Sequence, residues 1–322
     1  PETLVQQNFE NVDASAMTVG GLIAWARNAV GGIGSRIVGS AQNDTINSGN
    51  GADTIQGGGG DDTVVFDATT DLAGDSIDGG AGTDAIRLGV GGSYDFTTAG
   101  VSISNVEKLA INANAAFTVK LSDNFNSNNG NVEVVNTSGA ATSNAISIDA
   151  SAFTGGTAAL NVSATNFNAA DTFIGTSNGD TIYGGGGDDT ITGGGGADSI
   201  NAGAGADTLR FTQAQLDPVS GVSSVVGGGG TDTLLITAAT AALVDSNFSK
   251  FSGVETLKLT GANTIILGDI AQNTAGISTI VVGNDNTSIR LEDSVAMTID
   301  ASALPDGKTL TIAGNGTFTI TG

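Results

Sequence analysis

The 322-residue sequence predicts an all-β solenoid, a stack of short coils, on the basis of three observations. Aspartate recurs every nine residues inside glycine-rich turns, in two separate arrays. Glycine accounts for 50 residues, about twice its usual share, and aromatic residues for only 5%, which suits thin layers of small side chains better than a globular core. Between the arrays, apolar and polar residues alternate with a period of two, as in short strands.

The two arrays hold seven nonapeptides in phase. The first begins at Gly39 and reads GSAQNDTIN, SGNGADTIQ and GGGGDDTVV. The second begins at Gly175 and reads GTSNGDTIY, GGGGDDTIT, GGGGADSIN and AGAGADTLR. The sixth residue of every copy is aspartate: Asp44, Asp53, Asp62, Asp180, Asp189, Asp198 and Asp207. The eighth is apolar: Ile46, Ile55, Val64, Ile182, Ile191, Ile200 and Leu209.

The chemistry of calcium explains this spacing. Glycines at the first, second and fourth positions are expected to take positive φ, so that six residues curl tightly and their carbonyl oxygens converge. Calcium takes about six to eight oxygen ligands, which carbonyls and short aspartates supply. The last three residues then form a strand whose apolar residue points inward. A disordered linker is the alternative, but a linker would not hold an aliphatic residue two positions after each aspartate. The candidate ligand glycines are Gly39, Gly57, Gly59, Gly184, Gly186, Gly193 and Gly195.

On these nonapeptides the chain resembles the repeats-in-toxin (RTX) family of secreted Gram-negative proteins. The resemblance implies a right-handed parallel β-helix or β-roll in which two nonapeptides complete one coil and several calcium ions lie between turns two repeats apart. It implies three carboxylate pairs: Asp44 with Asp62, Asp180 with Asp198, and Asp189 with Asp207. The related segments GGAGTDAIR and GGGGTDTLL add Asp84 and Asp232 as candidate ligands.

Two aspartates fit this scheme less directly. Asp53 has no obvious partner within its array; a step of two repeats leads to Asp71, where the glycines are missing. Asp171 stands one repeat before Asp180, also without glycines, and is expected to pair with Asp189 in a weaker site.

A longer repeat surrounds the arrays. The DASA motif places Asp13, Asp149 and Asp300 at separations of 136 and 151 residues, and NVEKLAI from Asn105 recurs as GVETLKL from Gly253. We therefore expect five segments: 1–38, the end of a preceding unit; 39–87, the first array with its GGxGTD turn; 88–170, a solenoid segment; 171–236, the second array with its turn; and 237–322, a solenoid segment leading toward a further array. A β-sandwich between the arrays is the alternative. The phase of the repeat suggests a longer protein, with a type I secretion signal outside this sequence.

Composition excludes several functional classes. The 33 acidic and 10 basic residues give a net charge of −23, and no basic patch is available to bind nucleic acid. The absence of histidine and cysteine excludes zinc-imidazole sites, Ser-His-Asp triads and disulfides. The apolar stretch 14–26 is too short to span a membrane. Helical turns are expected only at 212–217 and 245–251.

These observations favour a structural protein, not an enzyme, secreted to the extracellular cell surface. The array-plus-strand organisation resembles Gram-negative surface-layer proteins, which implies self-association into a lattice; cell-surface polysaccharide would bind outside this fragment. Aspartates expected to be exposed, such as Asp75, Asp78, Asp285 and Asp293, are candidates for calcium between subunits, but solvated acidic loops are the favoured interpretation. The extender of a large adhesin or biofilm-matrix protein is the alternative. A calcium-dependent polysaccharide-active enzyme would need a base such as Lys108, Lys120, Lys250 or Lys258, but Lys258 is expected to form a surface pair with Glu255.

Overall fold

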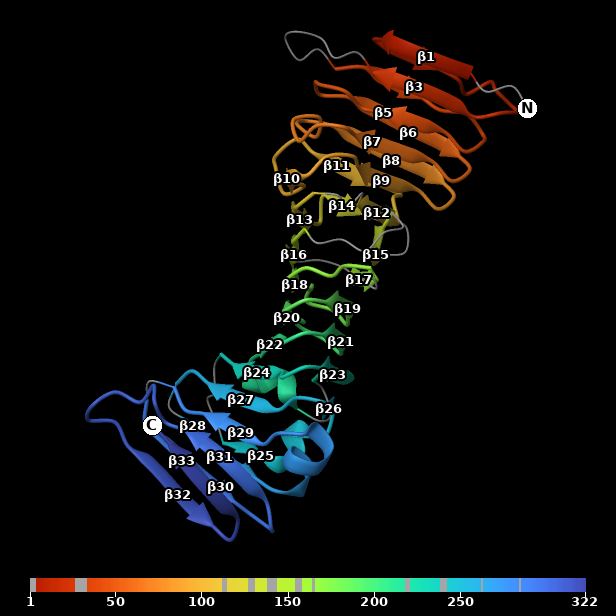
Figure 1. Cartoon of the computed structure of the whole chain (residues 1–322). Coiled ribbons are helices and arrows are strands. Elements are labelled where there is room, and N and C mark those ends of the chain that lie inside the picture. The colour runs from red at the N-terminus through yellow and green to blue at the C-terminus, as the bar shows by residue number, and fades with distance from the viewer. Residues whose placement is uncertain are drawn as a thin grey trace. The chain divides into compact units, whose positions relative to one another are not determined.

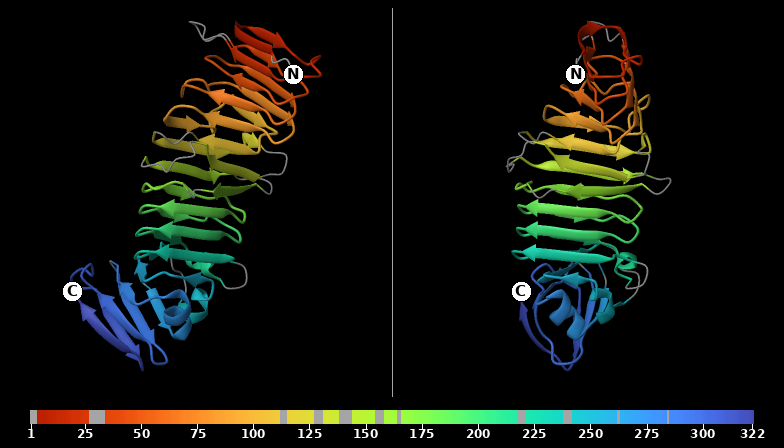
Figure 2. Two further views of the ribbon diagram at one scale, coloured as in Figure 1. Left: turned by 45° about the vertical axis from the view of Figure 1, so that its right-hand side comes forward. Right: turned by 90° about the vertical axis from the view of Figure 1, so that its right-hand side faces the viewer.

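A computed structural model describes residues 4–26, 34–111, 115–126, 131–137, 144–153, 158–163, 166–217, 221–237, 242–261, 263–283 and 285–322. The chain divides into two compact units, Pro1–Asn168 and Ala169–Gly322, called unit 1 and unit 2 below. In each unit short strands pair in parallel with the strands of the neighbouring coils (Figures 1 and 2). Each unit is therefore a β-solenoid, which fits the predicted right-handed parallel β-helix or β-roll.

Unit 1 contains strands of three sheets, which are named here in their stacking order. The first contains β1 (Leu4–Phe9), β3 (Leu22–Ala26), β5 (Thr45–Asn47), β7 (Thr63–Phe66), β9 (Ala85–Leu88), β12 (Lys108–Ile111), β15 (Asn131–Asn136) and β17 (Ala159–Ser163). The second contains β2 (Asn11–Asp13), β4 (Arg36–Val38), β6 (Thr54–Gly59), β8 (Ser76–Ala81), β11 (Ser102–Ser104) and β14 (Phe125–Asn126). The third contains β10 (Gly92–Asp95), β13 (Phe117–Ser122) and β16 (Ile146–Ala152).

Unit 2 also contains strands of three sheets. One group is β19 (Thr181–Gly186), β21 (Ser199–Ala204), β23 (Ser224–Gly229) and β26 (Phe251–Ser252). The second is β18 (Thr172–Ile174), β20 (Thr190–Thr192), β22 (Thr208–Phe211), β24 (Thr233–Ile236), β27 (Thr256–Leu259), β29 (Thr279–Val281), β31 (Ala296–Asp300) and β33 (Thr317–Thr321). The third is β25 (Leu243–Val244), β28 (Asn263–Leu267), β30 (Thr287–Leu291) and β32 (Leu310–Gly314).

The core of each unit is a set of aliphatic columns in register. The eighth residue of every nonapeptide points inward, as predicted, and is at most 2% exposed. In unit 1, Ile46 pairs with Val64 of the next coil, Val64 with Ile86, and Ile86 with Leu109. Burying each such side chain stabilises the fold by about 1.5–3 kcal/mol, and the parallel stack repeats this gain at every coil.

The segments between and after the arrays continue the same solenoid within each unit. In unit 1 the column runs on from Leu109 to Val134 and then to Val162, all in parallel register. The β-sandwich considered as an alternative is therefore wrong for the described strands. The reason is that the segments with a period-two pattern form strands short enough to fit one side of a coil, so each strand pairs in parallel with a strand of the neighbouring coil.

Short helical turns interrupt the coils of unit 2. The turns η1 (Gln213–Leu216) and η2 (Asp245–Phe248) lie where the sequence predicts them. A third, the π-helical turn η3 (Ile270–Ala275), was not predicted, because its small and polar residues carry no helical periodicity. Among the described residues no helix is long and apolar enough to cross a membrane.

The DASA motif makes the same local hydrogen bond in all three copies. The amide of Ser15 donates to the Asp13 carboxylate at 3.0 Å, Ser151 to Asp149 at 3.0 Å, and Ser302 to Asp300 at 2.9 Å. The bond satisfies the serine amide locally; at Asp13 and Asp300 it lies where a strand ends, whereas the strand that contains Asp149 continues to Ala152. The three copies therefore share this local hydrogen bond, and the longer repeat as a structural unit stays a prediction.

Candidate metal centres

Glycines give the array turns their shape in two distinct ways. Those at the second and fourth positions have positive φ, as predicted, for example Gly58 (110°) and Gly60 (99°) in unit 1. The first-position glycines do not, so the prediction of positive φ there is wrong. They are needed for space instead: a Cβ on Gly184 would lie 2.6 Å from the Asp189 Oδ2 and would overlap the carbonyl oxygen of Ala202. A first-position glycine thus leaves room for the carboxylate that follows it.

Among the predicted ligand glycines, Gly39, Gly57, Gly184 and Gly193 are first-position residues of this kind. The other three, Gly59, Gly186 and Gly195, lie at the third position. There the amides of Gly59 and Gly195 donate to the carbonyls of Ser40 and Thr176, at 3.0 and 2.9 Å. These third-position amides hold adjacent coils together, and the assignment of the seven glycines as ligands stays a prediction.

The array aspartates of unit 1 form ladders across successive coils. The backbone amide of Asp44 donates to Asp62 Oδ1 at 2.8 Å, and the amide of Asp62 donates in turn to Asp84 Oδ1 at 2.7 Å. We call each such bond between an acidic residue and the amide of the preceding coil a rung. In a second ladder, the amide of Asp53 donates to Asp75 Oδ1 at 2.8 Å.

Unit 2 repeats this arrangement. The amides of Asp171, Asp180 and Asp189 donate to Oδ1 of Asp189, Asp198 and Asp207, at 2.8, 3.0 and 2.8 Å. Asp207 continues to Asp232 at 2.9 Å. The predicted partners Asp44 and Asp62, Asp180 and Asp198, and Asp189 and Asp207 therefore face each other on adjacent coils, as do Asp171 and Asp189. Whether each pair shares a calcium ion stays a prediction.

The structure corrects the expectation for Asp53. Its neighbour on the next coil is Asp75, 22 residues away, and not Asp71. The segment between β7 and β8 lengthens this coil by four residues beyond two nonapeptides, so a step of 18 falls short. Asp71 instead accepts a hydrogen bond from the Ala68 amide at 2.8 Å.

The expectation that Asp75 is exposed is also wrong, because the residue is 0% exposed. Asp75 lies two residues before inward-pointing Ile77, the same spacing as in the nonapeptides, and this spacing could have identified Asp75 as an equivalent of the array aspartates.

The other aspartates considered for calcium between subunits are placed differently. Asp78 is half-buried and accepts a hydrogen bond from the Asn105 side chain at 2.6 Å. Asp285 forms an ion pair with Lys308 at 2.8 Å, and Asp293 is exposed. Of this group, only Asp75 joins a ladder.

In most rungs the second carboxylate oxygen has no partner within the protein. A buried, unsatisfied carboxylate oxygen is costly, and several together call for a cation. The atoms are Oδ2 of Asp53, Asp62, Asp75, Asp84, Asp189, Asp198, Asp207 and Asp232. Asp44 and Asp180 differ, since their Oδ2 atoms accept from the amides of Ser40 and Thr176 at 2.6 and 2.7 Å. These two begin their arrays with a turn that the protein itself satisfies.

Electrostatics points to the same need for a cation. Burial, together with the neighbouring carboxylates of each ladder, raises the pKa of Asp62 to about 7 and that of Asp189 to about 8. Burial likewise raises the pKa of Asp198 to about 7 and that of Asp75 to about 8. A bound cation would favour the ionised forms and reverse these shifts.

The residues present fit calcium. Within the described part of the chain, no group of three or more acidic side chains gathers around one point, so carbonyl oxygens of the turns would have to complete any ligand shell. Calcium accepts such mixed carboxylate and carbonyl shells. Zinc would instead require the histidine or cysteine that the sequence lacks. The aspartate Oδ2 atoms and turn carbonyls are therefore the groups that would hold calcium.

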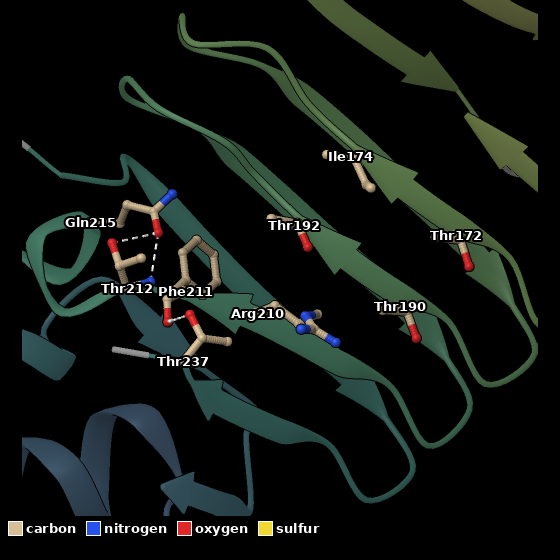
Figure 3. A pocket seen from close by; sticks show the side chains of 9 residues that line it. All are labelled: Thr172, Ile174, Thr190, Thr192, Arg210, Phe211, Thr212, Gln215 and Thr237. Atoms are coloured by element: carbon tan, nitrogen blue, oxygen red, sulfur yellow. Dashed lines mark hydrogen bonds between the residues drawn. The ribbon is translucent and has the colours of Figure 1, made fainter. Parts of the chain in front are cut away.

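A groove of about 440 Å³ lies on unit 2, on the outer face of β18, β20 and β22 (Figure 3). Its lining includes Arg210, the amide of Gln215 and a set of threonine hydroxyls. No carboxylate lines it, so this groove offers no acid and base pair for glycoside hydrolysis. The complete lining is Thr172, Ile174, Thr190, Thr192, Arg210, Phe211, Thr212, Gln215 and Thr237.

Comparison with known families agrees with the geometry of the turns. The sequence profile of the RTX calcium-binding nonapeptide repeat matches residues 30–72 and 174–209, in four copies. Comparison with curated proteins gave no match. The matched segments contain array turns from both units, with the glycines and aspartates described above. Across these two segments the chain matches the RTX calcium-binding nonapeptide repeat, which supports an RTX-type calcium-binding repeat protein.

Proposed function

We propose that the chain is a calcium-dependent structural module of a surface-layer protein, secreted by a type I pathway and assembled into a lattice on the cell surface. The observation that supports this proposal most directly is the row of buried carboxylate oxygens without partners in the turns of both units. Calcium at these oxygens would remove the repulsion within each ladder and couple its binding to folding. In a cytoplasm poor in calcium the arrays would stay open, and they would become rigid outside the cell.

A calcium titration followed by circular dichroism tests the calcium dependence. We expect the strand signal to rise with calcium, and a double Asp189→Asn and Asp198→Asn variant to need a higher calcium concentration to reach the same signal. Both residues carry a partnerless buried oxygen, and the amide of asparagine keeps the shape without the charge. A strand signal that is already complete in a chelator would contradict a structural role for calcium.

The extender of an adhesin remains the second candidate, because the same solenoid would serve as a stiff spacer. The unequal lengths of the DASA units, 136 and 151 residues, favour the lattice, since extender repeats tend toward constant length. Electron microscopy at millimolar calcium and in chelator separates the two candidates. Ordered sheets or filaments that appear only with calcium would support the lattice, whereas dispersed particles under both conditions would count against it.

A further inference from the structure

We propose that each array ends in an additional calcium site formed by an aspartate and a glutamate, Asp84 with Glu107 in unit 1 and Asp232 with Glu255 in unit 2. Neither glutamate lies in a nonapeptide, and both lie beyond the segments that match the repeat family. The proposal rests on the arrays binding calcium, and it adds the residues that complete the last site of each array.

Both glutamates make the rung that an aspartate makes elsewhere. The amide of Asp84 donates to Glu107 Oε2 at 2.9 Å, and the amide of Asp232 donates to Glu255 Oε2 at 2.8 Å. These distances lie within the range of the rungs between aspartates. The glutamate carboxylate therefore occupies the place that the next array aspartate would take.

The backbone register supports the same equivalence. Within the array, Thr63 follows Asp62 and its amide donates to the carbonyl of Asp44 at 2.9 Å. At the array end, Lys108 follows Glu107 and its amide donates to the carbonyl of Asp84 at 3.0 Å. Unit 2 has the matching bond, from the amide of Thr256 to the carbonyl of Asp232 at 2.9 Å. By backbone position as well as by side chain, each glutamate stands in an aspartate position.

A shorter turn with a longer side chain replaces the nonapeptide turn at these points. A Cβ on first-position Gly57 would overlap the carbonyl oxygen of Gly79, which opens the next turn. The corresponding glycines of the last copies, Gly79 and Gly227, instead face the carbonyls of Asn105 and Gly253. These two residues precede their glutamates by only two positions, whereas an array glycine precedes its aspartate by five. The additional methylene of glutamate offsets the shorter turn.

Backbone conformation marks the two shortened turns as equivalent. Asn105 has φ of 53° and Gly253 has φ of 61°. Positive φ is uncommon outside glycine, and at Asn105 the side chain is held by its hydrogen bond to Asp78. The two units thus reach the same carbonyl placement through different residues, so the placement does not depend on a single local sequence.

The atoms that face these carbonyls lack partners. Asp84 is 1% exposed and Asp232 is 0% exposed, and the Oδ2 atom of each is buried without a hydrogen bond. Glu107 adds a third such atom, Oε1. The ion pairs of the described residues include neither glutamate, and Glu255 does not pair with Lys258 as the sequence suggested. Two adjacent carboxylates beside a carbonyl, with no basic side chain paired to them, form a place for a divalent cation.

Counting bound calcium on the full chain tests the proposal. Glu107→Gln and Glu255→Gln keep an oxygen that accepts the aspartate amide, but they remove the charge and place an NH₂ group where the ligand oxygen stood. Native mass spectrometry at saturating calcium should show one ion fewer for each single variant and two fewer for the double variant. Glu292→Gln, on a glutamate paired with Arg290 at the surface, should leave the count unchanged.

The outcomes separate this proposal from the proposed function. If both Gln variants bind as many calcium ions as the wild type, the glutamates only cap the ladder. The proposal of terminal sites would then be wrong, whereas the proposal of calcium-dependent folding would be unaffected. A wild-type chain that binds no calcium would overturn both proposals. The two sites lie in separate units, so each single variant keeps the other array as an internal reference for correct folding, and circular dichroism at saturating calcium checks the fold.

Discussion

At the scale of single residues, the first-position glycine and the aspartate five positions later depend on each other. The missing side chain of the glycine leaves the space in which the carboxylate oxygen lies, and the carbonyl of the following turn borders the same space. A residue usually valued for backbone freedom is needed here because it is small.

We expect Gly184→Ala to destabilise the second array by about 1–3 kcal/mol, because the new methyl group would crowd the Asp189 carboxylate and the carbonyl of Ala202. The variant should also raise the calcium concentration at the midpoint of folding. The control is Gly229→Ala, where a Cβ would meet no atom within 4 Å and φ is not in the left-handed region. Equal midpoints for the two variants in a calcium titration would contradict this role for the first position.

At the scale of the elements, the regular coils could be predicted from the sequence and the irregular ones could not. The partners of Asp44, Asp180 and Asp189 could be predicted by counting two nonapeptides along the chain, because these coils all have the same length. The partner of Asp53 was missed because the segment after β7 changes the coil length, whereas a count in whole nonapeptides assumes that the length is constant. Glu107 and Glu255 were missed because a longer side chain took over an aspartate position.

The register of the lengthened coil can be tested at Asp75. Asp75→Asn should shift the calcium titration of the first array to higher concentration, since Asp75 faces Asp53 and has a partnerless buried oxygen. Asp71→Asn should shift it less, because the Asp71 carboxylate is engaged by the Ala68 amide. If Asp71→Asn had the larger effect, the step of 18 residues would be right and the 22-residue register wrong.

At the scale of the whole molecule, the raised carboxylate pKa values make folding without calcium depend on pH. In the folded chain the pKa is about 6 for Asp53 and Asp207 and about 8 for Asp75 and Asp189, against an ordinary value of 3.8. Burial is the first cause in each case. A group with a raised folded pKa binds its proton more tightly in the folded state. Its contribution to stability is therefore complete below about pH 4 and is lost as pH rises through 6 to 8.

We therefore expect the part of the fold that persists in chelator to melt at a higher temperature at pH 5 than at pH 8. With saturating calcium the trend should reverse over the same window, because calcium requires the ionised carboxylates and must displace their protons at lower pH. Thermal unfolding at the two pH values, with and without calcium, measures both trends. A melting temperature in chelator that rises between pH 5 and pH 8 would show that these carboxylates are not protonated in the folded state.

The rungs also have a polarity. In every one of them the amide belongs to the earlier coil and the carboxylate to the later coil, and in each unit one ladder ends in a glutamate. An aspartate can satisfy its amide only after the coil that follows it in the chain is in place. The hydrogen bonds of the ladder that ends in Glu107, and of the ladder that ends in Glu255, are therefore expected to form in order from the C-terminal end toward the N-terminal end.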